Sequence, residues 1–199
     1  EQRTVHLEIM GLICGTLQAL ITKLELSHIT HHSDDLMMLF INVLKYDVIL
    51  CEDAIYAVEA LVSRLEATFS KYIVSLAPIL MIGLNNPEAH YVCSACIGLL
   101  GAIARALNET FFHTFTQEGC DALMKILLEL SQNQEIDISI KPHIMSCIGD
   151  LGFALDTQFD RYINFALDAL RQASESELDD DDDDEENIVI LNSLRENIL

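Results

Sequence analysis

The chain alternates between apolar stripes at helical spacing and short polar breaks. Over residues 139–174 the first apolar stripe runs through Ile140, Ile144, Ile148, Leu151 and Leu155. This spacing is typical of an amphipathic helix. After a break at 156–157 comes a second stripe, made of Phe159, Tyr162, Ile163, Ala166 and Leu170. The pattern therefore predicts a helical hairpin, which needs a neighbour on each side to bury its apolar surface.

Copies of this hairpin run along the chain. Phe69, Phe111 and Phe159 are separated by 42 and 48 residues and lie at similar places in each copy. Two helices in a period of ~40–47 residues are typical of HEAT-type solenoids. We therefore predict an all-α, right-handed HEAT-repeat solenoid of stacked antiparallel helix pairs, with about four repeats and a partial one. The predicted repeats are 5–46, 51–85, 87–132 and 139–174.

Two breaks inside these repeats carry predictions of their own. The first repeat should pair a helix over 5–26 with one over 35–45, joined by a polar turn at 27–33. The histidines of this turn, His28, His31 and His32, could hold a metal ion with Asp34, but an ordinary polar turn explains them better, and we predict no metal. In the second repeat, Pro78 should kink or restart the second helix.

Charge changes the picture at the end of the chain. The net charge is -21, and the run from Glu175 to Glu186 supplies ten carboxylates without one basic residue. Such a block repels itself, so we predict an acidic flexible loop over 175–187, followed by the first helix of a further repeat over 188–199. The rest of the chain still carries 22 carboxylates against 11 Lys and Arg. This balance argues against direct nucleic-acid binding and favours basic partners.

The hydrophobic content bears on location. The chain is 51% hydrophobic, enough for a sizeable core, but its most apolar stretch, 73–84, is too short to span a membrane. The first residues also lack the apolar segment of a signal peptide. We therefore predict no membrane insertion. The chain begins without Met and stops inside a helical pattern, which suggests a piece of a longer solenoid.

Motifs for chemistry are weak. Six cysteines lie among apolar neighbours inside helical patterns, as reduced core thiols do. Cys93 and Cys96 form a C-x-x-C, but a structural zinc site usually needs a second such pair. The phosphate-binding and nucleophile-elbow motifs are also missing from the sequence. We predict a protein that is not an enzyme and has no cofactor.

Scattered core and turn residues resemble the importin-beta (karyopherin-beta) family. They include Glu52-Asp53-Ala54, Phe69-Ser70-Lys71-Tyr72, Gly98-Leu99-Leu100-Gly101, Ile148-Gly149-Asp150 and Leu170-Arg171-Gln172-Ala173-Ser174. Their joint order is similar to the later-middle HEAT repeats of that family. The resemblance implies a nuclear transport receptor that carries cargo through nuclear pores and is unloaded by Ran-GTP. It also implies a location in the cytoplasm and nucleus, including the nuclear pore.

The resemblance further implies two binding faces. In this family the first helices of the repeats (A helices) line the outer face, and grooves between them hold phenylalanines of FG nucleoporins. The A helices expected here are Asp53–Glu66, His90–Leu107 and Ile140–Leu155. Exposed apolar positions on them are the groove candidates: Val58, Leu61, Val62, Leu65, Ile97, Leu100 and Ile103. The alternative for each of these residues is an ordinary core position.

The second helices (B helices) line the inner face, where basic cargo or the basic importin-beta-binding segment of importin alpha docks. The candidate carboxylates there are Glu118, Asp121, Glu129, Asp160 and Asp168, together with the acidic loop. The alternative for each residue is a solvated helix face, and for the loop an unstructured spacer. A protein of another class fits the same pattern, namely a structural HEAT scaffold subunit, such as one of a phosphatase-type complex, with no transport role. Binding of phenylalanine peptides would separate the two.

Overall fold

The structure is a computed structural model that describes residues 2–46 and 52–175. Within these residues the chain forms helices and short turns, without a strand. The long helices are α1 (Gln2–Lys23), α2 (Leu26–Tyr46), α3 (Glu52–Leu65), α4 (Ile73–Leu84), α5 (His90–Leu107), α6 (Phe111–Gln132), α7 (Ile140–Leu155) and α8 (Ile163–Glu175). Short 3-10 segments precede three of them: η2 (Glu66–Tyr72), η3 (Asn108–Thr110) and η4 (Asp156–Arg161). The predicted helix 188–199 and nearly all of the predicted acidic loop lie outside the described residues.

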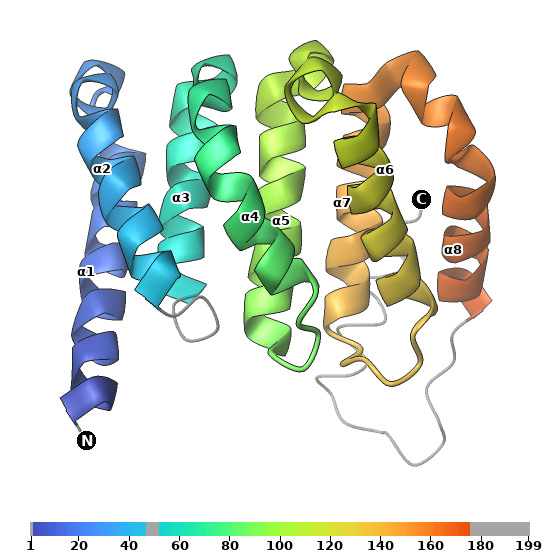
Figure 1. The fold of residues 1–199 in the computed structure, drawn as a ribbon, viewed down its shortest axis with the longest axis horizontal. Helices are drawn as coiled ribbons and strands as arrows, with labels where there is room; N and C mark the ends of the chain where they lie inside the picture. Colours follow the sequence, from blue (N-terminus) through green and yellow to red (C-terminus); the bar gives the residue numbers. More distant parts are fainter. Residues whose placement is uncertain (1, 47–51, 176–199) are drawn as a thin grey trace.

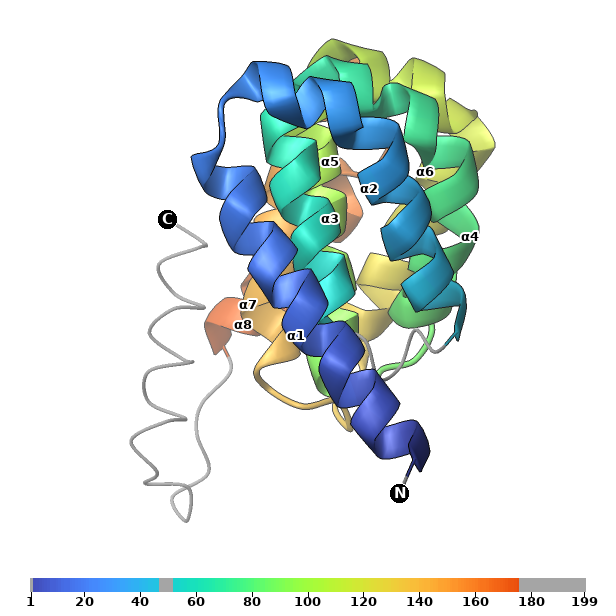
Figure 2. The ribbon, with the colours of Figure 1, turned by 90° about the vertical axis from the view of Figure 1, so that its left-hand side faces the viewer.

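The helices stack as antiparallel pairs in two layers (Figure 1). One layer, the A layer, contains α1, α3, α5 and α7, and the other, the B layer, contains α2, α4, α6 and α8. Seen from the end of α1 and α2, the two layers lie side by side (Figure 2). Contacts between neighbours are far more extensive within the A layer than within the B layer. The predicted all-α stack of helix pairs is confirmed, whereas the residue boundaries of the repeats stay a prediction.

The A helices of three pairs end in the same way. Glu66, Asn108 and Asp156, which each follow the last residue of an A helix, have a positive φ of 48°, 44° and 44°. The amides of Asn108 and Asp156 still donate to the carbonyl four residues back, so the helical ladder is complete when the chain turns. Each of these residues lies three positions before one of the recurring phenylalanines. The period seen in the sequence is therefore the period of a backbone turn.

Each of these three turns carries an aromatic ring that packs into the fold. Phe69 and Phe111 are fully buried, and Phe159 is half-buried in the last pair that the structure describes. A buried aromatic side chain contributes a large apolar area to the contact between two helices. The ring of Phe69 packs edge-on against Tyr72, and Phe159 packs in the same way against Tyr162. The matching Phe and Tyr positions of the sequence are therefore equivalent in space.

The polar turn expected at 27–33 is wrong. Those residues form the first turns of α2, which begins at Leu26. Ile29 and Ser33 are buried in register with Met37 and Phe40, one helical turn apart. Because Ser33 donates its hydroxyl hydrogen to the Thr30 carbonyl 2.9 Å away, it is tolerated on the buried face. The apolar stripe of α2 therefore starts almost two helical turns before the expected start of the helix. The three histidines among its first residues made this part of the sequence resemble a polar turn.

The expected restart of the second helix at Pro78 is also misplaced. The interruption is η2, upstream of the proline, and α4 runs from Ile73 through Pro78 to Leu84. The strained residue at the end of α3, rather than the missing amide of proline, ends the preceding helix.

Candidate binding surfaces

The seven groove candidates are core residues. Each has between 0% and 5% of its surface exposed: Val58, Leu61, Val62, Leu65, Ile97, Leu100 and Ile103. The expectation that they are exposed is therefore wrong. The physical reason is that α3 and α5 each lie between two A-layer neighbours and against the B layer, so most of their circumference is covered. A peptide ring cannot reach these side chains unless the A helices separate.

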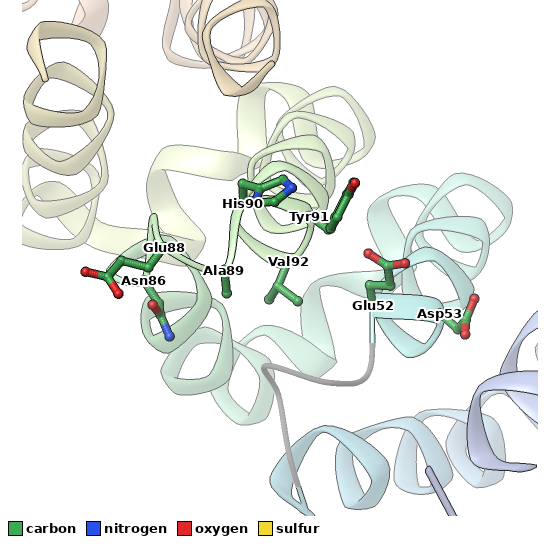
Figure 3. Close-up of a pocket in the computed structure, with 8 residues that line it drawn as sticks. All are labelled: Glu52, Asp53, Asn86, Glu88, Ala89, His90, Tyr91 and Val92. Atoms are coloured by element: carbon green, nitrogen blue, oxygen red, sulfur yellow. The ribbon is translucent and has the colours of Figure 1, made fainter. Parts of the chain in front are cut away.

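An open hollow does exist between two A helices, at the N-terminal ends of α3 and α5 (Figure 3). It has a volume of about 650 Å³ and is lined by Glu52, Asp53, Asn86, Glu88, Ala89, His90, Tyr91 and Val92. Tyr91 is 68% exposed, whereas Val92 is buried. Figure 3 shows Ala89 and Val92 between Tyr91 and Glu52 on one side and Asn86 and Glu88 on the other. The hollow thus combines an apolar centre with an aromatic wall and acidic edges.

The sequence explains why this end is acidic and open. Glu52 and Asp53 occupy the first turn of α3, where carboxylates are stabilised by the helix dipole. The ring of Tyr91 leans against His90 on α5, with ring centroids 4.0 Å apart. The sequence pattern did not indicate this hollow, because the groove candidates lie away from the N-terminal ends of the A helices. An aromatic residue at the second position of a helix that follows a turn was the available signal.

Four of the five inner-face carboxylates have partners within the chain. Glu118 accepts from the Thr116 hydroxyl at 3.0 Å, and its own backbone amide and Thr116 lower its pKa. Glu129 pairs with Lys125 at 3.6 Å, and Asp168 pairs with Arg171 at 3.9 Å. Asp121 accepts a hydrogen bond from Tyr162. Among the described residues, Asp160 is the one of the five whose side-chain carboxylate has no hydrogen bond or ion pair, although its backbone carbonyl accepts from the Tyr162 amide.

Asp121 belongs to a contact between helix pairs that occurs twice. The Tyr162 hydroxyl donates to Asp121, and Arg161 approaches the same carboxylate at 4.0 Å. Arg161 and Tyr162 belong to the turn before α8, and Asp121 belongs to α6. Burial and the adjacent carboxylate both raise the pKa of Tyr162, so the phenol stays protonated and can donate.

The earlier copy of this contact joins η2 to α2. Lys71 lies 2.7 Å and the Tyr72 hydroxyl 2.5 Å from the same oxygen of Asp34. The hydrogen bond from Lys71, followed by that from Tyr72, holds the pKa of Asp34 below its ordinary value. We call these two contacts the Asp34 clamp and the Asp121 clamp. The sequence showed the repeated basic-Tyr pair but not the carboxylate that it binds.

A third polar contact crosses the A layer. Arg105 on α5 pairs with Asp150 on α7 and also attracts Glu59 on α3. Gly101 lies beside this carboxylate, and an added Cβ there would come 2.6 Å from an Asp150 oxygen. Burial raises the pKa of Asp150 more than Arg105 lowers it. Gly101 is therefore needed for close approach rather than for backbone freedom.

The described residues offer no candidate site for thiol or metal chemistry. Cys93, Cys96, Cys120 and Cys147 are buried free thiols, and Cys14 is buried as well. Burial raises the pKa of Cys93 to about 11 and that of Cys96 to about 12, which keeps both thiols protonated and unreactive. Among the residues that the structure describes, no group of three potential His, Cys, Asp or Glu ligands lies together.

Helix length and composition are two measures of whether a segment can cross a membrane. Three helical stretches are long and apolar enough to cross a membrane by these measures: Val5–Lys23, Glu52–Leu84 and His90–Gln132. This corrects the expectation that the most apolar stretch is too short, because Ile73–Leu84 is continued upstream by α3 and η2. In the latter two stretches, 44% and 67% of the most apolar window is buried inside the fold. The prediction of no membrane insertion stays a prediction.

The stacked helix pairs, with their shared turn and clamps, define an α-solenoid, a class of protein that binds others along extended surfaces. Residues 1–199 match the model of the family described as "Importin subunit beta-1-like, TPR repeats". The chain belongs to this importin-beta-like family, as its motifs indicated.

Curated relatives support this assignment. The chain is 33% identical over 205 residues to importin subunit beta-1 of Arabidopsis thaliana, covering 100% of the chain and 23% of the relative. It is 30% identical over 177 residues to importin subunit beta-1 of Schizosaccharomyces pombe, covering 87% of the chain and 20% of the relative. The chain thus spans about a quarter of the length of these relatives or less. They are named as importin subunits, and not as enzymes.

Solved structures show the same fold. Importin beta crystallised in an ammonium sulfate condition superposes with a TM-score of 0.85 at 28% identity, over 98% of this chain and 22% of that one. A structure titled as the Kap95:Nup1 complex matches with a TM-score of 0.81 at 25% identity, over 96% of this chain and 22% of that one. These matches confirm the HEAT-type right-handed solenoid of importin beta.

Proposed function

We propose that this chain is part of a nuclear transport receptor that works in Ran-regulated protein import. The observation that carries the proposal is the family match over residues 1–199. As a part of such a receptor, it would contribute surfaces for FG nucleoporins and for a basic segment of cargo or importin alpha. Its location would be the cytoplasm and nucleus, including the nuclear pore. The alternative of a scaffold subunit without a transport role loses support, because the chain belongs to the importin-beta-like family.

Structural neighbours support the two named partners of the whole protein. One neighbour is a complex of Kap95 with Nup1. Another, with a TM-score of 0.74 at 25% identity over 92% of this chain and 20% of that one, is Kap95p bound to RanGDP. By analogy we propose a nucleoporin site on this chain and a Ran site on the full-length protein.

The hollow between α3 and α5 is the place we propose for a nucleoporin phenylalanine. Its volume of about 650 Å³ is ample for a phenyl ring. Tyr91 offers a ring for stacking, and Ala89 and Val92 offer an apolar centre. A Phe side chain buries roughly 150 Å² or more in such a site, and an aromatic pair adds about 0.5–1.5 kcal/mol. The seven buried candidates would line a deeper groove only after α3 and α5 separate.

Asp160 is the inner-face position we propose for a basic partner. It is exposed and its side-chain carboxylate has no hydrogen bond or ion pair among the described residues, whereas the Asp121 carboxylate is held by Tyr162. A carboxylate without a partner can accept a Lys or Arg without breaking an existing contact. Exposed ion pairs contribute about 0–1 kcal/mol each, so such a face works through several charges together.

The nucleoporin proposal is tested by titrating the chain with an FxFG-type peptide while backbone amide NMR shifts are followed. We expect saturable shifts over residues 88–92 and none with a peptide in which Phe is replaced by Ser. Tyr91→Ser should weaken binding by roughly threefold to tenfold. Tyr56→Ser, at an exposed tyrosine of α3 outside the hollow, is the matched control and should bind normally.

Two results would contradict the site. Absence of shifts at millimolar peptide would remove the nucleoporin site from this part of the chain. Equal shifts with the serine peptide would show that binding does not depend on the phenyl ring. For the basic partner, Asp160→Asn should weaken binding of an importin-alpha-type basic peptide more than Glu129→Gln, since Glu129 already pairs with Lys125.

A further inference from the structure

Three junctions connect the four helix pairs of the solenoid. The first lies between α1/α2 and α3/α4, the second between α3/α4 and α5/α6, and the third between α5/α6 and α7/α8. All three are packed with apolar side chains. They differ in the polar contacts that cross them, and this difference has a mechanical consequence.

The first and third junctions are fixed on both layers. In the first, Arg64 donates to the Leu24 carbonyl at 2.6 Å on the A side, and the Asp34 clamp closes the B side. In the third, Arg105 pairs with Asp150 on the A side, and the Asp121 clamp closes the B side. Hydrogen bonds are directional, so contacts on opposite layers resist both sliding and bending.

The second junction lacks such contacts. Among the described residues, the one hydrogen bond that crosses it is a weak thiol contact of 3.9 Å from Cys93 to the Leu84 carbonyl. Arg105 attracts Glu59 across it, without an ion pair. Apolar packing is non-directional and tolerates small shifts of one helix along another.

The sequence shows why no clamp forms there. Two and three positions after Phe111, the chain has His113 and Thr114, where the other turns have Lys71-Tyr72 and Arg161-Tyr162. Thr114 donates back to its own turn, to the Thr110 carbonyl. The opposite helix, α4, has the sequence IVSLAPILMIGL and offers no carboxylate. Both halves of the clamp are therefore missing at this junction.

Hollows flank the same junction at both ends. The hollow of about 650 Å³ opens between the N-terminal ends of α3 and α5. A second, of about 270 Å³, is lined by Ser63 and Glu66 at the end of α3 and by Ala102, Arg105 and Ala106 at the end of α5. Open space therefore lies at both ends of the α3–α5 contact, and a hollow of about 400 Å³ also lies beside the third junction, at His90 and Asp137. This geometry permits a rocking motion about the packed centre.

We infer that the second junction is the bending point of this part of the solenoid, between two stiffer units of two helix pairs each. The residues that set its position are His113, Thr114 and the uncharged α4. Bending there changes the width of both hollows, because both lie between the helices that rock.

Double electron–electron resonance tests it on the 199-residue chain. Spin labels on genetically encoded amino acids, which leave the native thiols untouched, would replace the exposed residues Met38, Val74, Lys125 and Leu167 of the B layer. The pairs 38/74, 74/125 and 125/167 cross the first, second and third junctions. We expect the distance distribution across the second junction to be about twice as wide as the other two, as a junction with weaker coupling requires. Equal widths at all three junctions would overturn the inference.

Removing a clamp supplies the second test. In the double variant Asp34→Asn/Tyr72→Phe, the 38/74 distribution should widen toward that of the 74/125 pair, with the Arg64 bond to the Leu24 carbonyl still in place. Asp35→Asn, which changes a neighbouring exposed carboxylate that makes no hydrogen bond or ion pair with the described residues, is the matched control and should leave the width unchanged. Circular dichroism would check that each variant stays helical. An unchanged width in the folded double variant would show that the clamp does not stiffen the junction.

Discussion

The two layers of the solenoid use their residues differently. In α5 of the A layer, 12 of 18 residues are buried, whereas in α6 of the B layer 7 of 22 are buried. The A helices are held by small and apolar side chains in close contact, while the B helices carry the clamps and most of the exposed charge. The A layer therefore supplies most of the stability, and the B layer sets the geometry between helix pairs. Changes in the two layers should differ accordingly.

Truncating a core residue of the A layer should have the largest effect. Leu61→Ala removes a side chain that is 0% exposed and leaves a cavity between α3 and its neighbours. We expect a loss of about 2–5 kcal/mol in the free energy of unfolding, measured by urea denaturation. Val74→Ala in the B layer, where the side chain is 85% exposed, should change it by less than about 0.5 kcal/mol. Similar losses in both variants would break the contrast between the layers.

Two glycines give a sharper comparison. An added Cβ at Gly83 in α4 would come 2.3 Å from the Cys96 sulfur, whereas at Gly98 in α5 it would meet nothing within 4 Å. Gly83→Ala should therefore cost about 1–3 kcal/mol through overpacking. Gly98→Ala should gain up to about 1 kcal/mol from helix propensity. Thermal unfolding of both variants measures the difference.

The sulfur contact is the proposed cause of the first effect, so it has its own control. Adding Cys96→Ala to Gly83→Ala should recover part of the loss, since the obstructing atom is gone. If Gly83→Ala alone were as stable as Gly98→Ala, the close approach of α4 to α5 would not be as tight as the structure has it.

Much of the fold was readable from the sequence because apolar periodicity is a local signal. The helices predicted at 90–107 and 140–155 match α5 and α7, and the phenylalanine period matches the positive-φ turns. The start of α2 could not be read from the sequence, because Ser33 interrupts the apolar stripe and His28 and His32 lie on either side of it. A polar residue that bonds its own helix can lie on a buried face, and periodicity alone does not show this.

The binding surfaces were far less predictable. Leu61 and Ile97 satisfy the pattern of a groove residue as well as that of a core residue, and only the packing of neighbouring helices separates the two. Likewise, Asp121 and Asp160 read alike in the sequence, but Tyr162 binds the first of them from 41 residues away. Such long-range pairing cannot be derived from local spacing. The hollow at Tyr91 depends on the same long-range arrangement.

Within the B layer, the Asp121 clamp should have a moderate effect. Tyr162→Phe removes one hydrogen bond to a carboxylate that keeps Arg161 nearby and stays partly exposed. We expect a loss of about 1 kcal/mol in the free energy of unfolding, measured by urea denaturation. Tyr56→Phe, at a tyrosine without a hydrogen-bond partner among the described residues, should be neutral. Equal effects of the two variants would mean that the clamp does not stabilise the fold.

The Asp34 clamp should have the smallest effect, visible mainly as a dependence on pH. Its bonds with Lys71 and Tyr72 lower the pKa of Asp34 from the ordinary value of 3.8. A carboxyl group whose pKa is lowered by folding stabilises the protein above its unfolded pKa and loses that contribution as the pH falls through its folded pKa. The stability gap between the wild-type chain and Asp34→Asn should therefore be constant from pH 7 to about pH 5 and should close below pH 3.8. Because these side chains are exposed, 1 M salt should narrow the gap at neutral pH. Urea midpoints measured for both proteins across this range give the comparison, and a gap that stayed constant down to pH 3 would show that the ionised carboxylate is not what joins η2 to α2.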